Sequence, residues 1–228
     1  MVKKVLLFST LLSIQFQTQS FWWFSKKAAI TIEQGDITQA QTECIVNAAN
    51  DLLLNGQGVC GAIFKAAGSK ALQQACNKFP INDNLVRCPT GEARITGSFN
   101  LKSKGITHII HAVGPDCRII TDEDQQNTLL KQTYQNSLNL ATQHKIKSIS
   151  FPFISSAIYA FPKDRAARIA LETVREYVKK NKTSLKVINF VLFSQDDFDL
   201  FTKINKELAQ ADQFKFVMFI RNLMGIKS

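Results

Sequence analysis

The sequence is organised around residues 44–68, CIVNAANDLLLNGQGVCGAIFKAAG. It opens with a short apolar run that predicts a buried strand, and amide side chains follow at Asn47 and Asn50. A glycine-containing loop then leads into apolar residues that recur at helical spacing from Val59 onward. The first N–H groups of a helix are unpaired and its dipole is positive at that end, so this arrangement favours a phosphate-bearing ligand. The alternative is a tight turn that needs its glycines only for their backbone freedom.

The rest of the chain alternates strand and helix patterns. Strands are predicted at 28–33, 45–48, 92–96, 106–113, 148–154 and 185–193, and helices at 59–76, 121–144, 164–180 and 196–208. Strands that alternate with helices predict an α/β fold, in which helices cover both faces of one sheet. A length of 228 residues without a linker-like stretch predicts one domain with tails.

Several polar or aromatic residues follow directly after predicted strands. In an α/β sheet, ligands bind beyond the carboxyl ends of the strands, at helix N-termini. That rule gathers Asp36, Asn50, the loop 155–161 and Phe193 at one edge of the sheet. The loops before the helices predicted at 59–76 and 164–180 both favour anions, so a diphosphate could bridge them. Phe193 could instead pack in the core, and Asp36 could serve only as a turn-forming residue.

Charge and cysteine content bear on several functional classes. The net charge is +10, but the lysines are scattered and no basic run of five or more exists, which disfavours a dedicated nucleic-acid binder. Five cysteines without a CxxC pair, and only three histidines, predict neither a disulfide framework nor a metal site. Cys60 stands at a helix start, where a thiol pKa is lowered, yet no partner histidine lies nearby in the sequence, so we do not expect a nucleophile.

The two ends of the chain differ from its centre. Residues 1–20 combine two lysines with a ten-residue apolar run and small residues before Phe21, which predicts a signal peptide and a secreted or periplasmic protein. A mitochondrial presequence is the alternative. Residues 209–228 form a basic, apolar tail that could be an amphipathic membrane helix, although we expect a helix docked on the domain. We therefore expect a monomer that contacts membranes, if at all, only through its termini.

Four segments, in this order, resemble the macrodomain family of ADP-ribose-binding proteins. They are GDIT at 35–38, IVNAAN with GQGVCGAIFKAAG at 45–68, CPTGEARITG with ITHIIHAVGP at 88–115, and FPFISSAIYAFP at 151–162. The resemblance implies a three-layer α/β/α fold with a central mixed sheet over residues 28–208. It is strongest to the subclass that removes mono-ADP-ribose from protein carboxylates and deacetylates O-acetyl-ADP-ribose. It implies no cofactor, and its partners would be ADP-ribose or an ADP-ribosylated protein.

The resemblance also implies a role for each matching residue. Asp36 would accept a hydrogen bond from the adenine amino group, the Ile37 N–H would meet the ring, and Phe193 would lie near it. Asn50 would hold the distal ribose beside Tyr159, and catalysis would centre on Asn50 and Cys60. The diphosphate would be held by the backbone of two loops, which comprise Gly58, Val59 and Cys60 in the first and Ser156, Ala157, Ile158 and Tyr159 in the second.

Two departures from the family pattern concern the chemistry. Hydrolytic members often read GVDG where this chain reads GVCG at residues 58–61, so Cys60 replaces the aspartate that would orient or activate water. Loss of a general base costs on the order of 10²–10⁴ in rate. Ala157 and Ala160 replace glycines of the second loop, and alanine disfavours positive φ. The sequence therefore predicts a hydrolase, with a non-catalytic ADP-ribose-binding module as the alternative.

Overall fold

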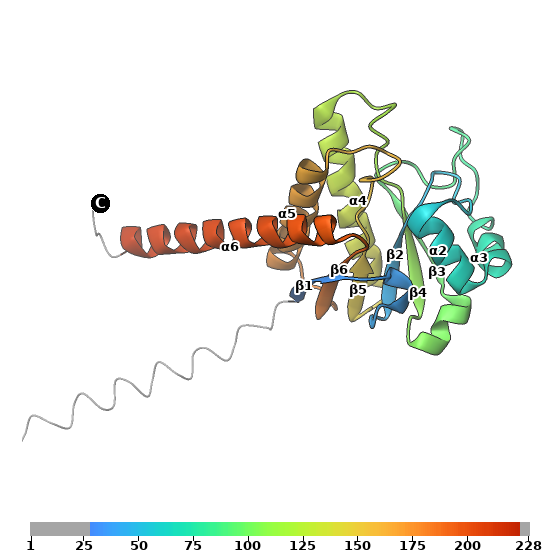
Figure 1. Cartoon of the computed structure of the whole chain (residues 1–228), viewed down its shortest axis with the longest axis horizontal. Coiled ribbons are helices and arrows are strands. Elements are labelled where there is room, and N and C mark those ends of the chain that lie inside the picture. Colours follow the sequence, from blue (N-terminus) through green and yellow to red (C-terminus); the bar gives the residue numbers. More distant parts are fainter. Residues whose placement is uncertain (1–27, 224–228) are drawn as a thin grey trace, which may run out of the picture.

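The computed structural model of the chain describes residues 28–223. The predicted signal peptide at 1–20 lies outside the described residues. A six-stranded sheet forms the centre of the molecule, in the order β1-β6-β5-β2-β4-β3 (Figure 1). In this order, the neighbouring strands from β1 through β6, β5 and β2 to β4 pair in parallel. The edge strand β3 is antiparallel to its neighbour, β4. The strands are β1 (Ala29–Gln34), β2 (Cys44–Ala48), β3 (Ala93–Gly97), β4 (His108–Ala112), β5 (Ser148–Phe151) and β6 (Val187–Leu192).

Helices cover both faces of this mixed sheet, which confirms the predicted three-layer α/β/α fold. One core cluster joins the sheet to α4, α5 and the first half of α6, and the other joins it to α2 and α3. The helices are α2 (Gly58–Ala67), α3 (Ser69–Cys76), α4 (Glu123–Gln143), α5 (Lys163–Lys180) and α6 (Gln195–Leu223), with short 3-10 turns η2 (Ile37–Gln39) and η3 (Phe99–Lys104).

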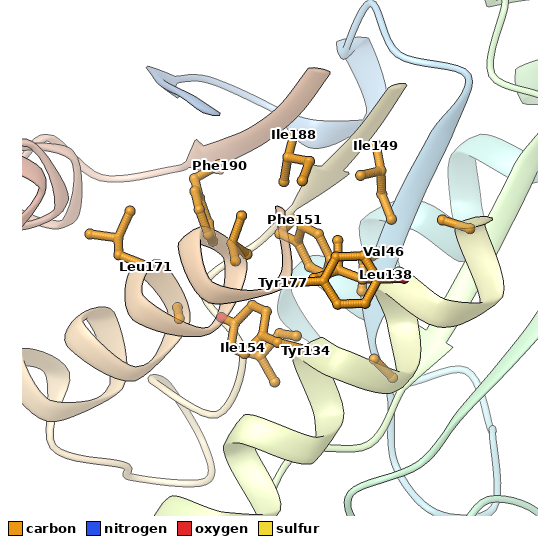
Figure 2. Packing of buried hydrophobic residues seen from close by; sticks show 14 of the residues in the cluster. Val46, Tyr134, Leu138, Ile149, Phe151, Ile154, Leu171, Tyr177, Ile188 and Phe190 are labelled. Carbon is orange, nitrogen blue, oxygen red and sulfur yellow. The ribbon is translucent and has the colours of Figure 1, made fainter. Parts of the chain in front are cut away.

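The core between the sheet and α4, α5 and α6 is rich in aromatic rings. Tyr134 of α4 lies 5.3 Å from Phe151 of β5, and Phe151 lies 5.9 Å from Phe190 of β6, measured between ring centroids (Figure 2). All three side chains are fully buried. Burial of such a side chain stabilises the fold by roughly 1.5–3 kcal/mol. This packing fixes β5 and β6, and therefore the loops that leave their carboxyl ends.

Two predicted elements are shorter than the sequence suggested. The helix predicted at 59–76 is two helices, because Gly68 between them adopts a φ of +93°. A Cβ at this position would also lie 3.0 Å from the Asn100 side chain, so glycine is required there. The strand predicted at 148–154 ends at Phe151. Pro152 follows, and a proline cannot donate to the ladder of a central strand.

The largest error concerns the C-terminal region. We expected a helix at 196–208 and a separate tail docked on the domain, but the structure has one continuous helix, α6, of 29 residues. Its last part extends away from the domain and leaves Phe214, Phe216 and Phe219 exposed (Figure 1). The docking prediction is therefore wrong for the described part of the tail. Within residues 28–223 no helix combines the length and apolarity that crossing a membrane requires.

Candidate functional site: a two-part cleft at the carboxyl edge of the sheet

Two adjoining cavities lie at the carboxyl ends of the parallel strands. The first measures about 270 Å³ and lies between the loop before α2 and the loop after β5. The second measures about 470 Å³ and lies beside the ends of β1 and β6. The two share Gly58, Val59, Phe153 and Ala157 on their walls. All the site residues predicted from sequence line one or both cavities: Asp36, Ile37, Asn50, Gly58, Val59, Cys60, Ser156, Ala157, Ile158, Tyr159 and Phe193. Their individual roles remain predictions.

The first wall of the cleft is the loop 49–57, which side-chain amides hold in place. Asn50 pairs with the backbone of Leu54 through two bonds: its Nδ2 donates to the carbonyl at 2.8 Å, and its Oδ1 accepts from the N–H at 2.9 Å. Gln73 of α3 accepts from the Asn55 N–H at 2.8 Å and donates to the Leu53 carbonyl at 3.2 Å. Asn50 keeps one amide N–H beyond these bonds, because Nδ2 carries two.

The start of α2 continues this wall and depends on close backbone approach. Gly58 begins the helix with a φ of +57°, which favours glycine. A Cβ added to Gly61 would lie only 2.6 Å from the carbonyl oxygen of Gly56. The glycines of the GQGVCG sequence thus bring the loop onto the first turn of the helix. The unpaired N–H groups of that turn border the cavity, where an anion would be favoured.

The second wall is the loop 152–161, which is held mainly by main-chain hydrogen bonds together with one bond from Ser156 Oγ to the Phe153 carbonyl at 3.0 Å. Ser155 and Ala160 both adopt left-handed backbone conformations, with φ of +62° and +52°. The Phe161 N–H donates to the Ser155 carbonyl at 3.0 Å, and the Ala160 N–H donates to the Ala157 carbonyl at 3.0 Å. We expected backbone strain at both alanines, but only Ala160 has a positive φ, so the expectation is wrong for Ala157.

Cys60 lies between the cleft and a buried polar network. Burial raises the pKa of its thiol, and the effect outweighs a hydrogen bond from Asn47 Nδ2 to Sγ at 3.6 Å. Asn47 Nδ2 also lies 3.2 Å from Nδ1 of His111, which is fully buried, and Nε2 of that ring lies 3.0 Å from the Thr96 hydroxyl. Desolvation lowers the pKa of His111 to about 4, so the ring is neutral at pH 7. Cys60 is therefore a protonated, packed thiol.

The second cavity carries the residues for which the family resemblance implies a place near an adenine ring. The Oδ1 atom of Asp36 accepts from the Thr38 N–H at 2.8 Å, so the turn-forming role of Asp36 is real. Phe193 is 85% exposed, which excludes the alternative that it packs in the core. Asp197, in the first turn of α6, lines the same cavity and adds a second carboxylate to it.

Sequence reasoning missed several residues of the cleft. Gly114 and Phe153 line the first cavity, and both follow directly after strands, so the edge rule could have found them. At the rim, the guanidinium of Arg118 lies 5.9 Å from the centre of the Tyr159 ring and pairs with Asp116 at 2.6 Å. Nothing in the local sequence signals this contact, because it joins loops that are 41 positions apart in the chain.

The first cavity is poor in groups that could transfer a proton. None of its lining residues in the described part of the chain is an aspartate, a glutamate or a histidine. The two ionisable side chains on its walls are Cys60 and Tyr159, and burial raises the pKa of both. Within residues 28–223 no group of three or more histidine, cysteine or acidic side chains could hold a metal ion. The cavity therefore offers backbone N–H groups and the Asn50 amide as its main polar contacts.

Comparison with known proteins identifies the family. A family model described as "Macro domain" matches residues 46–170. The chain is 43% identical over 175 residues to the O-acetyl-ADP-ribose deacetylase 1 of Pantoea vagans, which covers 77% of this chain and 97% of that protein. It is 39% identical over 184 residues to the ADP-ribose glycohydrolase MACROD2 of Xenopus laevis, covering 80% of this chain and 41% of the relative.

A solved structure agrees with these relatives. The Oceanobacillus iheyensis macrodomain with ADP superimposes with a TM-score of 0.74 at 40% sequence identity, covering 81% of this chain and 94% of that one. The chain therefore belongs to the macrodomain family, which confirms the resemblance that its four sequence segments predicted.

Proposed function

We propose that this protein binds ADP-ribose in the two-part cleft and hydrolyses ADP-ribosyl esters. The substrates would be mono-ADP-ribose esters on protein carboxylates or O-acetyl-ADP-ribose. The observation that carries the proposal is the convergence of two anion-friendly loops, at 56–60 and 155–160, across one cavity that opens into a second. The names of the relatives, an O-acetyl-ADP-ribose deacetylase and an ADP-ribose glycohydrolase, support the same chemistry.

The shape of the cleft supports a definite orientation of the ligand. The diphosphate would lie in the first cavity, at the start of α2, where backbone N–H groups and the helix dipole stabilise negative charge. Adenine would lie in the second cavity, against the exposed ring of Phe193 and beside Asp36. A carboxylate accepts several hydrogen bonds, so the bond from Thr38 leaves Asp36 free to accept from the adenine amino group.

Catalysis in this cleft would depend on positioning rather than on a protein base. Hydrolysis adds water across the ester and gives ADP-ribose and a free carboxylic acid. The thiol of Cys60 is protonated because burial raises its pKa, so it cannot accept a proton from water. The remaining amide N–H of Asn50 would orient the distal ribose, and a phosphate oxygen of the substrate would accept the proton. Such substrate assistance is slower than catalysis by a tuned general base.

Removal of the Asn50 amide tests this proposal. We expect Asn50→Ala to lower turnover of O-acetyl-ADP-ribose by roughly 10²-fold, because a misplaced reacting group costs about that much. Asn55→Ala is the matched control, since the Asn55 side chain makes no hydrogen bond within the described residues, and its turnover should match wild type. Titration calorimetry with ADP-ribose shows whether each protein still binds. Equal turnover by Asn50→Ala and wild type would contradict the proposal.

The second candidate function is a binding module without turnover, which the protonated Cys60 and the lack of a general base favour. Cys60→Asp introduces the aspartate that is often found at this position in hydrolytic members of the subclass that this chain resembles. If wild type binds ADP-ribose without turnover, and Cys60→Asp gains activity, the protein is a binding module. If wild type already turns over substrate and Cys60→Asp is faster by about 10²-fold, it is a hydrolase that lacks a general base.

We further propose that residues 1–20 act as a signal peptide, so that the mature protein is secreted or periplasmic. The charged start, the apolar run and the small residues before Phe21 support this, and a mitochondrial presequence is the alternative. Mass spectrometry of the protein from its native cells is expected to find Phe21 as the first residue. A chain that still begins at Met1 would contradict cleavage.

A further inference from the structure

The long helix α6 changes character at Asp212. Before that residue it is part of the domain, because Phe201 and Ile204 are buried in the core beneath it. Ion pairs and hydrogen bonds also tie it to α5. These bonds are Arg168 to Glu207 at 2.7 Å, Arg175 to Asn205 at 2.8 Å, Arg175 to Asp212 at 3.1 Å and Lys179 to Asp212 at 2.9 Å. The helix is therefore firmly held as far as Asp212.

Beyond Asp212 the side chains of α6 no longer bond to the rest of the described chain. No hydrogen bond or ion pair joins a side chain of residues 213–221 to any other part of the described chain. Phe216 is 64% exposed, Phe219 is 59% exposed and Leu223 is 68% exposed. Figure 1 shows this end of α6 extending away from the rest of the molecule. Large exposed apolar patches are rare on soluble proteins and mark sites of interaction.

The spacing of these residues makes a coherent apolar face. Phe216, Phe219, Ile220 and Leu223 recur at intervals of three and four, which places them on one side of the helix. Lys215 borders that face, and Arg221 lies on the opposite side of the helix, near the exposed Phe214 and Val217. The sixteen residues after Asp212 carry three cationic side chains and no acidic side chain. An apolar helix face with Lys or Arg on the other sides of the helix is typical of helices that lie in a membrane interface.

We propose that residues 213–223 of α6 dock on the surface of an anionic lipid bilayer, with the apolar face inserted among the acyl chains and the cations at the headgroups. Charge decides between a membrane and a second copy of the chain. Two copies would each bring Lys215 to the border of the same interface, and the full sequence carries a net charge of +10. An anionic surface attracts the same charges.

The docking end of α6 lies far from the cleft. The cleft borders the other end of α6, where Asp197 lines the second cavity. A helix rises about 1.5 Å per residue, so the docking end lies roughly 40 Å along the axis from the start of α6 and leaves the cleft open to solvent.

Vesicle co-sedimentation with the full-length protein tests the proposal. Wild type is expected to bind vesicles of equimolar phosphatidylglycerol and phosphatidylcholine, and to bind phosphatidylcholine vesicles less. The double variant Phe216→Asp with Phe219→Asp should bind the anionic vesicles at least about tenfold more weakly, because apolar burial is lost. Its matched control places the same changes at Ile81 and Leu85, two exposed apolar residues in the loop before β3, and should bind as wild type does.

A third variant separates the electrostatic contribution. Lys215→Gln with Arg221→Gln should weaken binding to anionic vesicles by roughly fivefold for each cation removed, and leave binding to neutral vesicles unchanged. All proteins carry the same residues 1–27, so a difference between them reports on α6 alone. Turnover of soluble substrate by each variant should match wild type.

Two results would overturn the proposal. One is equal vesicle binding by wild type and by the Phe216 and Phe219 variant. The other is a concentration-dependent dimer in analytical ultracentrifugation that this variant abolishes, with no binding to either vesicle. The second result would assign the apolar face to another copy of the chain.

Discussion

Each of the two walls of the cleft is a loop that contains left-handed residues, but different interactions hold the two loops in place. The first wall, the loop 49–57 with the start of α2, contains one left-handed residue other than glycine, Leu53, with a φ of +55°. Amides on either side brace it, because Asn50 and Gln73 bond the backbone around it. The second wall, the loop 152–161, contains two left-handed residues, Ser155 and Ala160, and its turn is spanned mainly by main-chain bonds, with one side-chain bond from Ser156 Oγ to the Phe153 carbonyl at 3.0 Å.

This difference shows which interactions stabilise each wall. A left-handed non-glycine residue costs roughly 1–2 kcal/mol, and it persists only where its surroundings enforce it. In the first wall the enforcing groups are side chains, and a buried network of Asn47, Cys60 and His111 lies beneath them. In the second wall the Ser155 hydroxyl is buried without a hydrogen-bond partner among the described residues. The first wall should therefore respond to changes in side-chain chemistry, and the second to changes in the backbone.

The largest expected difference between the two walls is in their loss of stability at low pH. Burial lowers the pKa of His111 to about 4 from the ordinary 6.5, so the unfolded chain binds a proton that the folded chain excludes. The contribution of neutral His111 to stability is complete above pH 6.5 and is lost as the pH falls from 6.5 towards 4. The linked loss is about 3 kcal/mol. Urea unfolding at pH 7 and pH 4.5 measures it.

One variant assigns this acid sensitivity. In His111→Gln the pH dependence of the unfolding free energy should become shallower than in wild type, because no imidazole is then buried at this position. Hydrogen exchange at pH 5 should rise first at residues 58–60, above the buried network, and later at 157–160. An unchanged slope in His111→Gln would show that other groups cause the acid loss.

Glycine substitutions should disturb one wall at a time, with an effect of about 2 kcal/mol on stability. Gly61→Ala places a Cβ 2.6 Å from the Gly56 carbonyl oxygen, and backbone cannot rotate away, so the first wall must shift. Gly114→Ala places a Cβ against the Ser155 hydroxyl and 2.6 Å from Cγ2 of Ile154, under the second wall. Side chains adjust more readily than backbone, so Gly61→Ala should weaken ADP-ribose binding more, by about tenfold.

The control for both substitutions is Gly97→Ala, because a Cβ there meets no atom within 4 Å. Titration calorimetry and thermal melting should find this variant close to wild type. If all three variants bind ADP-ribose equally, the close backbone approaches do not shape the cleft.

The sequence predicted the sheet and the edge of the cleft because both depend on local signals. Apolar runs ending in Asn47 or Gly114 mark the carboxyl ends of strands, and the topology of parallel sheets brings these ends together. The sequence could not predict the side chains that hold the first wall in place. Gln73 reaches the first wall from α3, and His111 lies beneath it from β4, and neither contact has a local signature.

The prediction for the C-terminal helix was wrong for a different physical reason. Residues 209–223 are apolar enough that burial on the domain was the expected outcome. Helical continuity through Asp212, which two cations of α5 hold, directs the chain away from the core instead. Pattern alone does not determine which surface an apolar face meets, because that depends on the direction in which the preceding helix points.

The smallest expected effect concerns the strain in the second wall. Ala160→Gly removes the Cβ from a residue with a φ of +52°, so the folded state should gain stability. Glycine also raises the entropy of the unfolded chain, which offsets part of this gain and leaves about 1 kcal/mol. Differential scanning calorimetry should record a rise in melting temperature of roughly 2–4 °C. Ala157→Gly is the matched control, because Ala157 has no positive φ, and its melting temperature should fall slightly. A lower melting temperature in Ala160→Gly would mean that the alanine Cβ contributes more by packing than its backbone costs, and the two walls would then be alike in depending on side chains.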